Sequence, residues 1–286
     1  MEKFKNFIKP LISNNKRLRI TTAVVMLLCA VLFFSIGPVA VCPLVLCISG
    51  LMIYEYDVNL FKTARIKYIW DLISVMGVCA LFCLNKATVN FPTYYFSVMF
   101  VILFCISNLF NIATDRKHWI FESLQPVYLG FGILSLLYLY FTSPVSLIYM
   151  FIITIATDSG AYFIGSFIGG PKLCPKISPS KTISGAIGGI ICAFIFGTTF
   201  LIIIIWNAGD YFGNIYILAL ITIILSIISQ TGDLFESYIK RLNNIKDSSD
   251  IIPGHGGVLD RFDSALFVAP VMALIIAFAK VGYILL

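Results

Sequence analysis

Long apolar runs separated by short polar turns dominate the chain from residue 18 onward. A helix needs about 20 apolar residues to cross the hydrocarbon core of a bilayer. Nine segments approach that length, so we predict an all-α polytopic membrane protein with about nine transmembrane helices. The segments are approximately Leu18–Ile36, Val39–Tyr54, Tyr68–Leu84, Tyr94–Asn111, Val127–Phe141, Ser146–Ile168, Ile183–Trp206, Asn214–Gly232 and Ser264–Leu286.

The first two segments are separated only by Gly37 and Pro38. Proline disrupts a helix that reaches it from the N-terminal side, and the Gly-Pro pair is typical of a turn. The pattern therefore predicts a tight helical hairpin rather than one long helix.

Composition agrees with a membrane protein. The 286 residues are 59% hydrophobic and only 12% charged, whereas a soluble domain carries about 25% charged residues. The mean hydropathy of +0.96 excludes an ordinary water-soluble enzyme, a disordered chain and a coiled coil. The net charge of +6 comes without a long basic tract, which excludes a nucleic-acid partner and leaves the lipid bilayer as the expected environment.

The basic residues predict an orientation. If the N-terminus is cytoplasmic, all 20 Lys and Arg residues except Lys86 and Lys280 fall in cytoplasmic regions. Such a bias is what the positive-inside rule describes. We therefore expect a multi-pass protein with a cytoplasmic N-terminus, in the inner or plasma membrane if the source is bacterial.

Polar residues suited to catalysis or ligand binding gather in the C-terminal half. We therefore expect a scaffold of transmembrane helices over residues 1–141 and a catalytic transmembrane region over 142–286. The first such group is Asp158, near the middle of the sixth apolar segment. A charged side chain there costs about 2.5–3.5 kcal/mol. It is either a structural Asp paired with a neighbouring helix or a ligand for a cation or a substrate hydroxyl in a cleft.

The second group is the segment K-I-S-P-S-K-T at residues 176–182. Hydroxyls, a lysine and the start of a helix together make an anion site, because free backbone N–H groups point at the ligand. Lys181 adds a compact cation suited to polyphosphate, with Ser178 and Thr182 beside it. The alternative is a capped helix start after a turn.

The third group spans residues 231–264, where acidic and basic residues alternate. If the eighth helix continues into the cytoplasm, Asp233, Ser237 and Lys240 share one face. Asp260 and Asp263 share a face at the start of the ninth helix. The intervening P-G-H-G-G is too flexible for a helix and lets the two helix ends meet.

Three carboxylates at one membrane edge repel each other unless a cation lies between them. Mg²⁺ prefers oxygen ligands and binds substrate phosphates, so we expect Mg²⁺ here, with room for a second cation. The basic residues that would neutralise the rest of a polyphosphate are Lys240, Arg241, Lys246 and Arg261. The alternative is a solvated loop of salt bridges.

Residues 237–263, S-Y-I-K-R-L-N-N-I-K-D-S-S-D-I-I-P-G-H-G-G-V-L-D-R-F-D, closely resemble the signature of the phosphatidate cytidylyltransferase (CDP-diacylglycerol synthase) family. The preceding Gly232-Asp233, the S-P-S-K-T loop and the D-S-G-A-Y segment resemble further landmarks of that family, in the expected order. The resemblance implies a membrane enzyme that condenses CTP with phosphatidic acid, giving CDP-diacylglycerol and pyrophosphate.

The resemblance also implies roles for single residues. Asp233, Asp260 and Asp263 would hold the catalytic cation, Lys240 would act beside them, and the other groups would bind substrate. These substrate-binding residues are Asp158, Ser178, Lys181, Thr182, Ser237, Arg241, Lys246, Asp247 and Arg261. The chain departs from the family pattern at Ser166, where members commonly have a basic residue, and at Ser184, where Glu is usual.

Two alternatives stay open at this point. An ion-coupled transporter would use Asp158 within Gly-broken helices. A catalytically silent relative acting as an assembly factor would fit the departures at Ser166 and Ser184. Small-residue helix faces permit a homodimer without requiring one.

Overall fold

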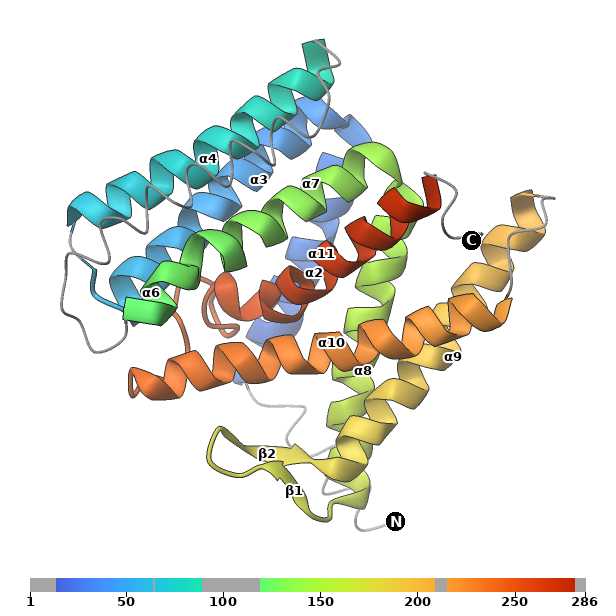
Figure 1. Ribbon diagram of the computed structural model, residues 1–286. Helices are drawn as coiled ribbons and strands as arrows, with labels where there is room; N and C mark the ends of the chain where they lie inside the picture. The colour runs from blue at the N-terminus through green and yellow to red at the C-terminus, as the bar shows by residue number, and fades with distance from the viewer. Residues whose placement is uncertain (1–13, 64, 89–118, 209–214, 281–286) are drawn as a thin grey trace. The chain divides into compact units, whose positions relative to one another are not determined.

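The computed structural model describes residues 14–63, 65–88, 119–208 and 215–280 and is built almost entirely of helices (Figure 1). The elements are α2 (Asn14–Ile36), α3 (Pro38–Tyr54), the π-helical turn η2 (Glu55–Leu60), α4 (Arg65–Thr88), α6 (Trp119–Gln125), the π-helical turn η3 (Pro126–Phe131), α7 (Gly132–Thr142), α8 (Pro144–Ile168), β1 (Lys172–Cys174), β2 (Ser178–Thr182), α9 (Ile183–Ala208), α10 (Ile215–Leu242) and α11 (Leu259–Lys280).

Eight helical stretches among the described residues are long and apolar enough to cross a membrane. They coincide with eight of the nine segments predicted from the sequence, which confirms the all-α membrane fold. The remaining segment, Tyr94–Asn111, lies outside the described residues. The cytoplasmic position of the N-terminus stays a prediction.

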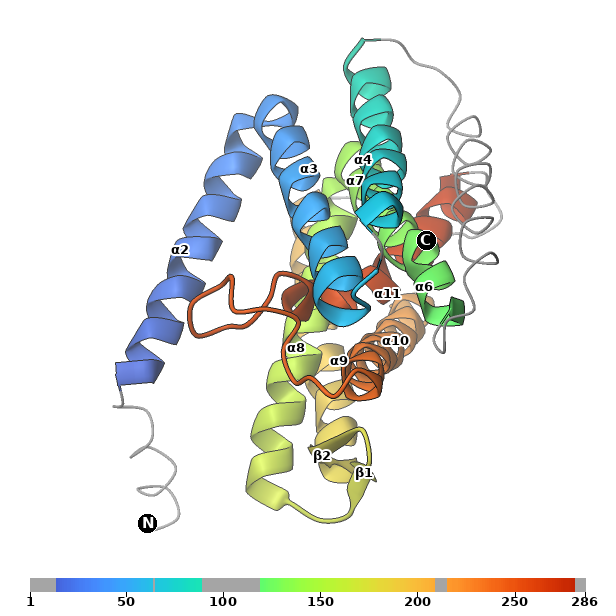
Figure 2. The same cartoon turned by 90° about the vertical axis from the view of Figure 1, so that its left-hand side faces the viewer.

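The helical hairpin at the start of the chain is confirmed. Helix α2 ends at Ile36, and α3 begins at Pro38. Between them Gly37 has φ +92°, a conformation that glycine adopts without steric cost. Proline at the first position of a helix loses no hydrogen bond. The two helices therefore run antiparallel beside each other (Figure 2).

The chain divides into two compact units. Unit 1 comprises residues 1–125 with 245–261, and unit 2 comprises residues 126–244 with 262–286. The predicted division into a scaffold over 1–141 and a catalytic region over 142–286 concerns function and stays a prediction. The structure adds that part of the signature segment, residues 245–261, packs with the N-terminal helices.

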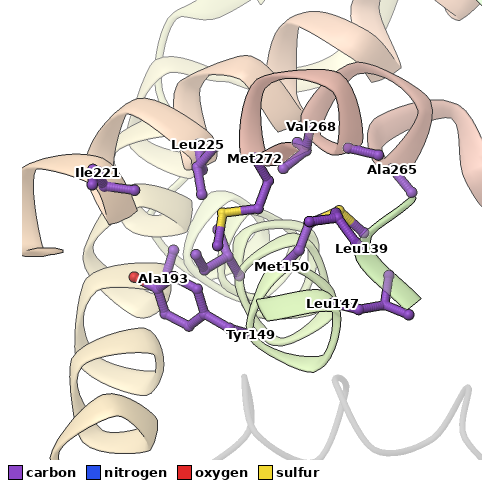
Figure 3. Close-up of a cluster of buried hydrophobic side chains, with 12 residues drawn as sticks. Leu139, Leu147, Tyr149, Met150, Ala193, Ile221, Leu225, Ala265, Val268 and Met272 are labelled. Atoms are coloured by element: carbon purple, nitrogen blue, oxygen red, sulfur yellow. The ribbon is translucent and has the colours of Figure 1, made fainter. Parts of the chain in front are cut away.

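Unit 2 is organised around the close pair α8 and α9. A Cβ at Gly160 would lie 2.6 Å from Cβ of Cys192, and one at Gly188 would lie 2.5 Å from Cβ of Ile164. Small residues at such positions let membrane helices approach and pack through backbone contacts. A buried apolar cluster, including Met150, Leu225 and Val268, joins side chains of α7, α8, α9, α10 and α11 (Figure 3).

Residues 172–182 form a small antiparallel hairpin, which the sequence analysis did not predict. Strands β1 and β2 pair with Lys172 opposite Thr182 and Cys174 opposite Ser178. Helix α9 begins at Ile183 as expected. The Thr182 hydroxyl accepts a hydrogen bond from the Gly185 backbone N–H at 3.1 Å and so caps the start of α9.

Candidate functional site

A cavity of about 620 Å³ opens in unit 2 between α8, the β-hairpin, α9 and α10. This volume lies within the range of small-molecule sites, about 300–1,000 Å³. Four predicted site residues line it, namely Asp158, Lys181, Thr182 and Asp233. The segments at residues 158 and 178–182 and the end of α10, which the sequence treated as separate groups, therefore contribute to one site.

Lys181 and Asp233 form an ion pair in this cavity. Nζ of Lys181 lies 2.5 Å from Oδ2 of Asp233, and the two side chains are 25% and 30% exposed. The Ser237 hydroxyl donates a hydrogen bond of 3.4 Å to Oδ1 of Asp233, which confirms that these residues share a face of α10. Half-exposed ion pairs contribute little to stability, so both charges can exchange partners when a ligand binds.

The cavity is also lined by residues that were not predicted from the sequence, among them Tyr162, Lys172 and Gln230. Tyr162 follows Asp158 by four positions on α8, and residues at this spacing share a helix face, so the pattern could have revealed it. Gln230 precedes Asp233 by three positions on α10, a spacing that also places two residues on one helix face. Its amide nitrogen donates to the carbonyl oxygen of Ala186 on α9, at 3.1 Å.

Asp158 is exposed on α8 and faces the cavity. This position agrees with a cleft, and the choice between a ligand-binding Asp and a structural Asp paired with a neighbouring helix stays a prediction. Ser166 also lines the cavity, and its hydroxyl donates to the carbonyl oxygen of Phe163 at 3.0 Å. The Ser184 hydroxyl donates to the carbonyl oxygen of Gly169. Ser166 thus makes a contact within its own helix, whereas Ser184 joins the start of α9 to the end of α8.

The last turns of α10 hold their basic residues in intramolecular contacts. Lys240 is buried, and its Nζ lies 3.2 Å from Oε1 of Glu236. Nε of Arg241 donates to the carbonyl oxygen of Ile177 at 3.3 Å. Lys240 thereby neutralises a buried carboxylate, and Arg241 ties α10 to the loop between the two strands. Ser178 is half-buried on β2.

Helices α10 and α11 cross tightly next to Asp233. A Cβ at Gly232 would lie 2.9 Å from the carbonyl oxygen of Asp263 and 3.0 Å from Cβ of Phe267. Only a residue without a side chain fits this crossing. The crossing brings the backbone next to Asp233 against the backbone of Asp263. Oδ1 of Asp263 accepts a hydrogen bond from the Ser264 backbone N–H at 2.6 Å. Two of the three predicted cation ligands thus belong to neighbouring backbone segments of unit 2.

Asp260 belongs to unit 1, in the first turn of α11, and is 8% exposed. Its Oδ2 accepts hydrogen bonds from the backbone N–H groups of Ser248, at 3.0 Å, and Gly257, at 2.9 Å. The carboxylate therefore closes the loop that precedes α11, a role that the sequence did not indicate. The remaining predicted residues, Lys246 and Asp247 in this loop and Arg261 in the first turn of α11, are exposed.

Within the described part of the chain, no group of three or more His, Cys, Asp or Glu side chains is arranged to hold a metal ion. Magnesium in nucleotide enzymes is commonly held by one or two carboxylates together with water and substrate phosphates. Asp233 and Asp263, both in unit 2, carry oxygen atoms of this kind, and a magnesium site at them stays a prediction.

Comparison with known proteins identifies the family of the chain. The sequence profile of the cytidylyltransferase family matches residues 17–279. The chain is 37% identical to the phosphatidate cytidylyltransferase of Bacillus subtilis (strain 168) over 235 residues, which cover 77% of this chain and 85% of that protein. It is 45% identical to the phosphatidate cytidylyltransferase of Staphylococcus haemolyticus over 156 residues, 54% of this chain and 57% of that protein.

A third relative is the phosphatidate cytidylyltransferase of Staphylococcus aureus (strain COL), which is 46% identical over 130 residues. This match covers 46% of the chain and 48% of that protein, so the matches span about half the length of the two staphylococcal proteins. The profile match and the Bacillus relative extend over most of the chain. The protein is thus an integral membrane enzyme that belongs to the cytidylyltransferase family.

Proposed function

We propose that the protein transfers the cytidylyl group of CTP to phosphatidic acid, giving CDP-diacylglycerol and pyrophosphate. The observation that carries this proposal is the Lys181–Asp233 ion pair in the cavity of unit 2. It offers one group of each charge: an ammonium for a phosphate of CTP and a carboxylate for a cation. Relatives named phosphatidate cytidylyltransferase supply the substrate class.

In this reaction an oxygen of phosphatidate attacks the α-phosphorus of CTP in line, and pyrophosphate leaves. Such transfers depend on positioning and charge neutralisation rather than on a protein nucleophile. Lys181 would leave Asp233 and bind a phosphate of CTP. Lys172 lines the same cavity and adds a second positive charge. Thr182 would fix the junction between β2 and α9 by capping the helix.

Asp233, Asp260 and Asp263 are the proposed ligands of Mg²⁺, which when bound would neutralise the phosphates and stabilise the leaving group. The tight crossing at Gly232 supports the pairing of Asp233 with Asp263. The proposed role of Asp260 comes from the family resemblance and from its place one helical turn before Asp263. A second cation remains part of the proposal.

We place this reaction at the cytoplasmic membrane interface, because CTP is a cytosolic nucleotide and the lipid headgroup lies in the interfacial layer. The distribution of basic residues along the chain supports this orientation. A homodimer is compatible with the proposal, which does not depend on it.

The deciding experiment is incubation of the purified protein with labelled CTP and phosphatidic acid in detergent. We expect labelled CDP-diacylglycerol and one equivalent of pyrophosphate, with no product when Mg²⁺ is chelated. A transporter that uses Asp158 would release no pyrophosphate from CTP and lipid. A silent relative would form no product under any condition, and either result would refute the proposal.

A further inference from the structure

The carboxylate of Glu55 is completely buried in unit 1, at the junction of α3 and η2, nearly 200 residues before its partners in the chain. It accepts four hydrogen bonds from neutral donors. These come from Ser248 Oγ at 3.0 Å, Ser249 Oγ at 2.5 Å, Val258 N at 2.9 Å and Leu259 N at 2.7 Å. Glu55 therefore joins the end of α3 to both ends of the loop that leads into α11.

Two of these donors lie at the start of α11, where backbone N–H groups have no acceptor within the helix. A carboxylate placed there satisfies these groups and interacts favourably with the helix dipole. Helix α11 thus receives its capping carboxylate from a distant part of the chain. A buried charge is tolerated only when it is hydrogen-bonded, so the four donors and the carboxylate stabilise each other.

Asp260 completes the arrangement from inside the loop. Its Oδ2 accepts the Ser248 and Gly257 backbone N–H groups. The consecutive backbone amides of residues 257, 258 and 259 are therefore shared between the carboxylates of Asp260 and Glu55. A shift of one carboxylate would leave amides of the same turn without an acceptor.

The neighbouring residues fit this arrangement. A Cβ at Gly257 would run into the Ser248 hydroxyl and lie 2.7 Å from Oε2 of Glu55. Gly256 has φ +80°, and a Cβ there would lie 2.8 Å from Oδ2 of Asp260. The side-chain amide of Asn59, on the same π-helical turn as Glu55, donates to the carbonyl oxygen of Ser248 at 3.0 Å. The loop passes the end of α3 in Figure 2.

From these contacts we propose that Glu55 is a positioning residue for cytidylyl transfer. It fixes the first turn of α11 and thereby holds Asp260 in the orientation needed to take part in cation binding. The proposal rests on the proposed function, because it assumes that Asp260 acts in that reaction. Glu55 acts through the protein, because its carboxylate accepts hydrogen bonds from loop hydroxyls and backbone amides.

The test compares Glu55→Gln with Glu122→Gln, which changes another buried carboxylate of unit 1 outside the loop. Gln keeps the size of Glu but replaces one accepting oxygen by a donor that faces backbone N–H groups. For Glu55→Gln we expect kcat to fall about 10- to 100-fold, as for groups that orient metal ligands. The Mg²⁺ concentration for half-maximal rate should rise, while KM for CTP changes less than about threefold. Ser249→Ala removes one of the four donors and should give a smaller loss.

Hydrogen–deuterium exchange provides a readout that does not depend on activity. In Glu55→Gln the amides of Val258 and Leu259 should exchange faster than in the wild type, whereas Glu122→Gln should leave them unchanged. Equal kcat losses and equal Tm losses in the two variants would indicate general destabilisation and overturn the positioning role. Unchanged exchange and unchanged kcat in Glu55→Gln would overturn it as well.

A wild-type protein that forms no CDP-diacylglycerol would refute the proposed function, and the positioning role would fall with it. The exchange experiment would still report whether Glu55 holds the start of α11. If the wild type is active and the Glu55→Gln variant has a normal Mg²⁺ dependence, the positioning role alone is refuted. The two failures are therefore distinguishable.

Discussion

The loop before α11 in unit 1 and the cavity of unit 2 hold their carboxylates in opposite ways. In unit 1, Glu55 and Asp260 are buried and accept backbone N–H groups. In unit 2, Asp233 is about one-third exposed and is paired with the side chain of Lys181. Buried acceptors cannot leave without stranding their donors, which costs about 1–3 kcal/mol for each group. An exposed ion pair contributes about 0–1 kcal/mol. The loop before α11 is thus suited to fixed geometry, and the cavity of unit 2 is suited to exchanging partners with a ligand.

The largest effect expected is that of Asp260→Asn. This variant tests whether a buried carboxylate that accepts backbone amides also takes part in the reaction. Asn can keep one acceptor for the loop amides but removes the negative charge. We expect product formation to fall at least about 100-fold, because even groups that only orient metal ligands are worth about 10- to 100-fold. The measurement is CDP-diacylglycerol formed by folded, membrane-inserted protein. Unchanged turnover at saturating Mg²⁺ would remove Asp260 from the proposed cation site.

Lys181→Gln tests the exchangeable pair. Loss of a charge-assisted hydrogen bond of about 1.5–3 kcal/mol should raise KM for CTP about 10- to 100-fold. Because the pair is partly exposed, Tm should change little. Steady-state kinetics at varied CTP gives KM, with Lys62→Gln, an exposed lysine of unit 1, as the matched control. A variant with normal KM and a large loss of Tm would show that Lys181 has a structural role instead.

Gly160→Ala tests how closely unit 2 must pack to form its cavity. The new methyl group would meet Cys192 and the carbonyl oxygen of Gly188, at 2.6 and 3.0 Å. Overpacking of this kind costs about 1–3 kcal/mol, so Tm in detergent should fall. Gly77→Ala on α4 is the control, because nothing lies within 4 Å of a Cβ there. It should be neutral or stabilising by up to about 1 kcal/mol, and equal shifts in the two variants would contradict the packing argument.

Features that depend on nearby residues could be predicted from the sequence, and those that depend on distant ones could not. Apolar length identified the helices, Gly37-Pro38 identified the hairpin, and a four-residue spacing identified the contact of Asp233 with Ser237. The hairpin at residues 172–182 was missed because its strands are short and β2 contains Pro179, which is unusual within strands. The role of Glu55 was not visible either, because its donors lie nearly 200 residues away and only folding brings them together.

The smallest effect expected concerns His255, which links the loop of unit 1 to α2. Its Nδ1 lies 2.8 Å from the Thr22 hydroxyl. Burial, together with the positive charges of Arg261 and Arg19, lowers the pKa of His255 from its ordinary value of 6.5.

A group with a lowered folded-state pKa stabilises the protein while it is neutral, and that contribution is lost as the pH falls below about 6.5 toward the folded-state pKa. The contribution should be small, because the ring is mostly outside the protein interior. The difference in Tm between wild type and His255→Gln should therefore shrink slightly from pH 7.5 to pH 5. A difference that is constant over this range would show that the contact does not depend on a neutral ring, and the fixed geometry of this loop would then rest on its carboxylates and backbone amides.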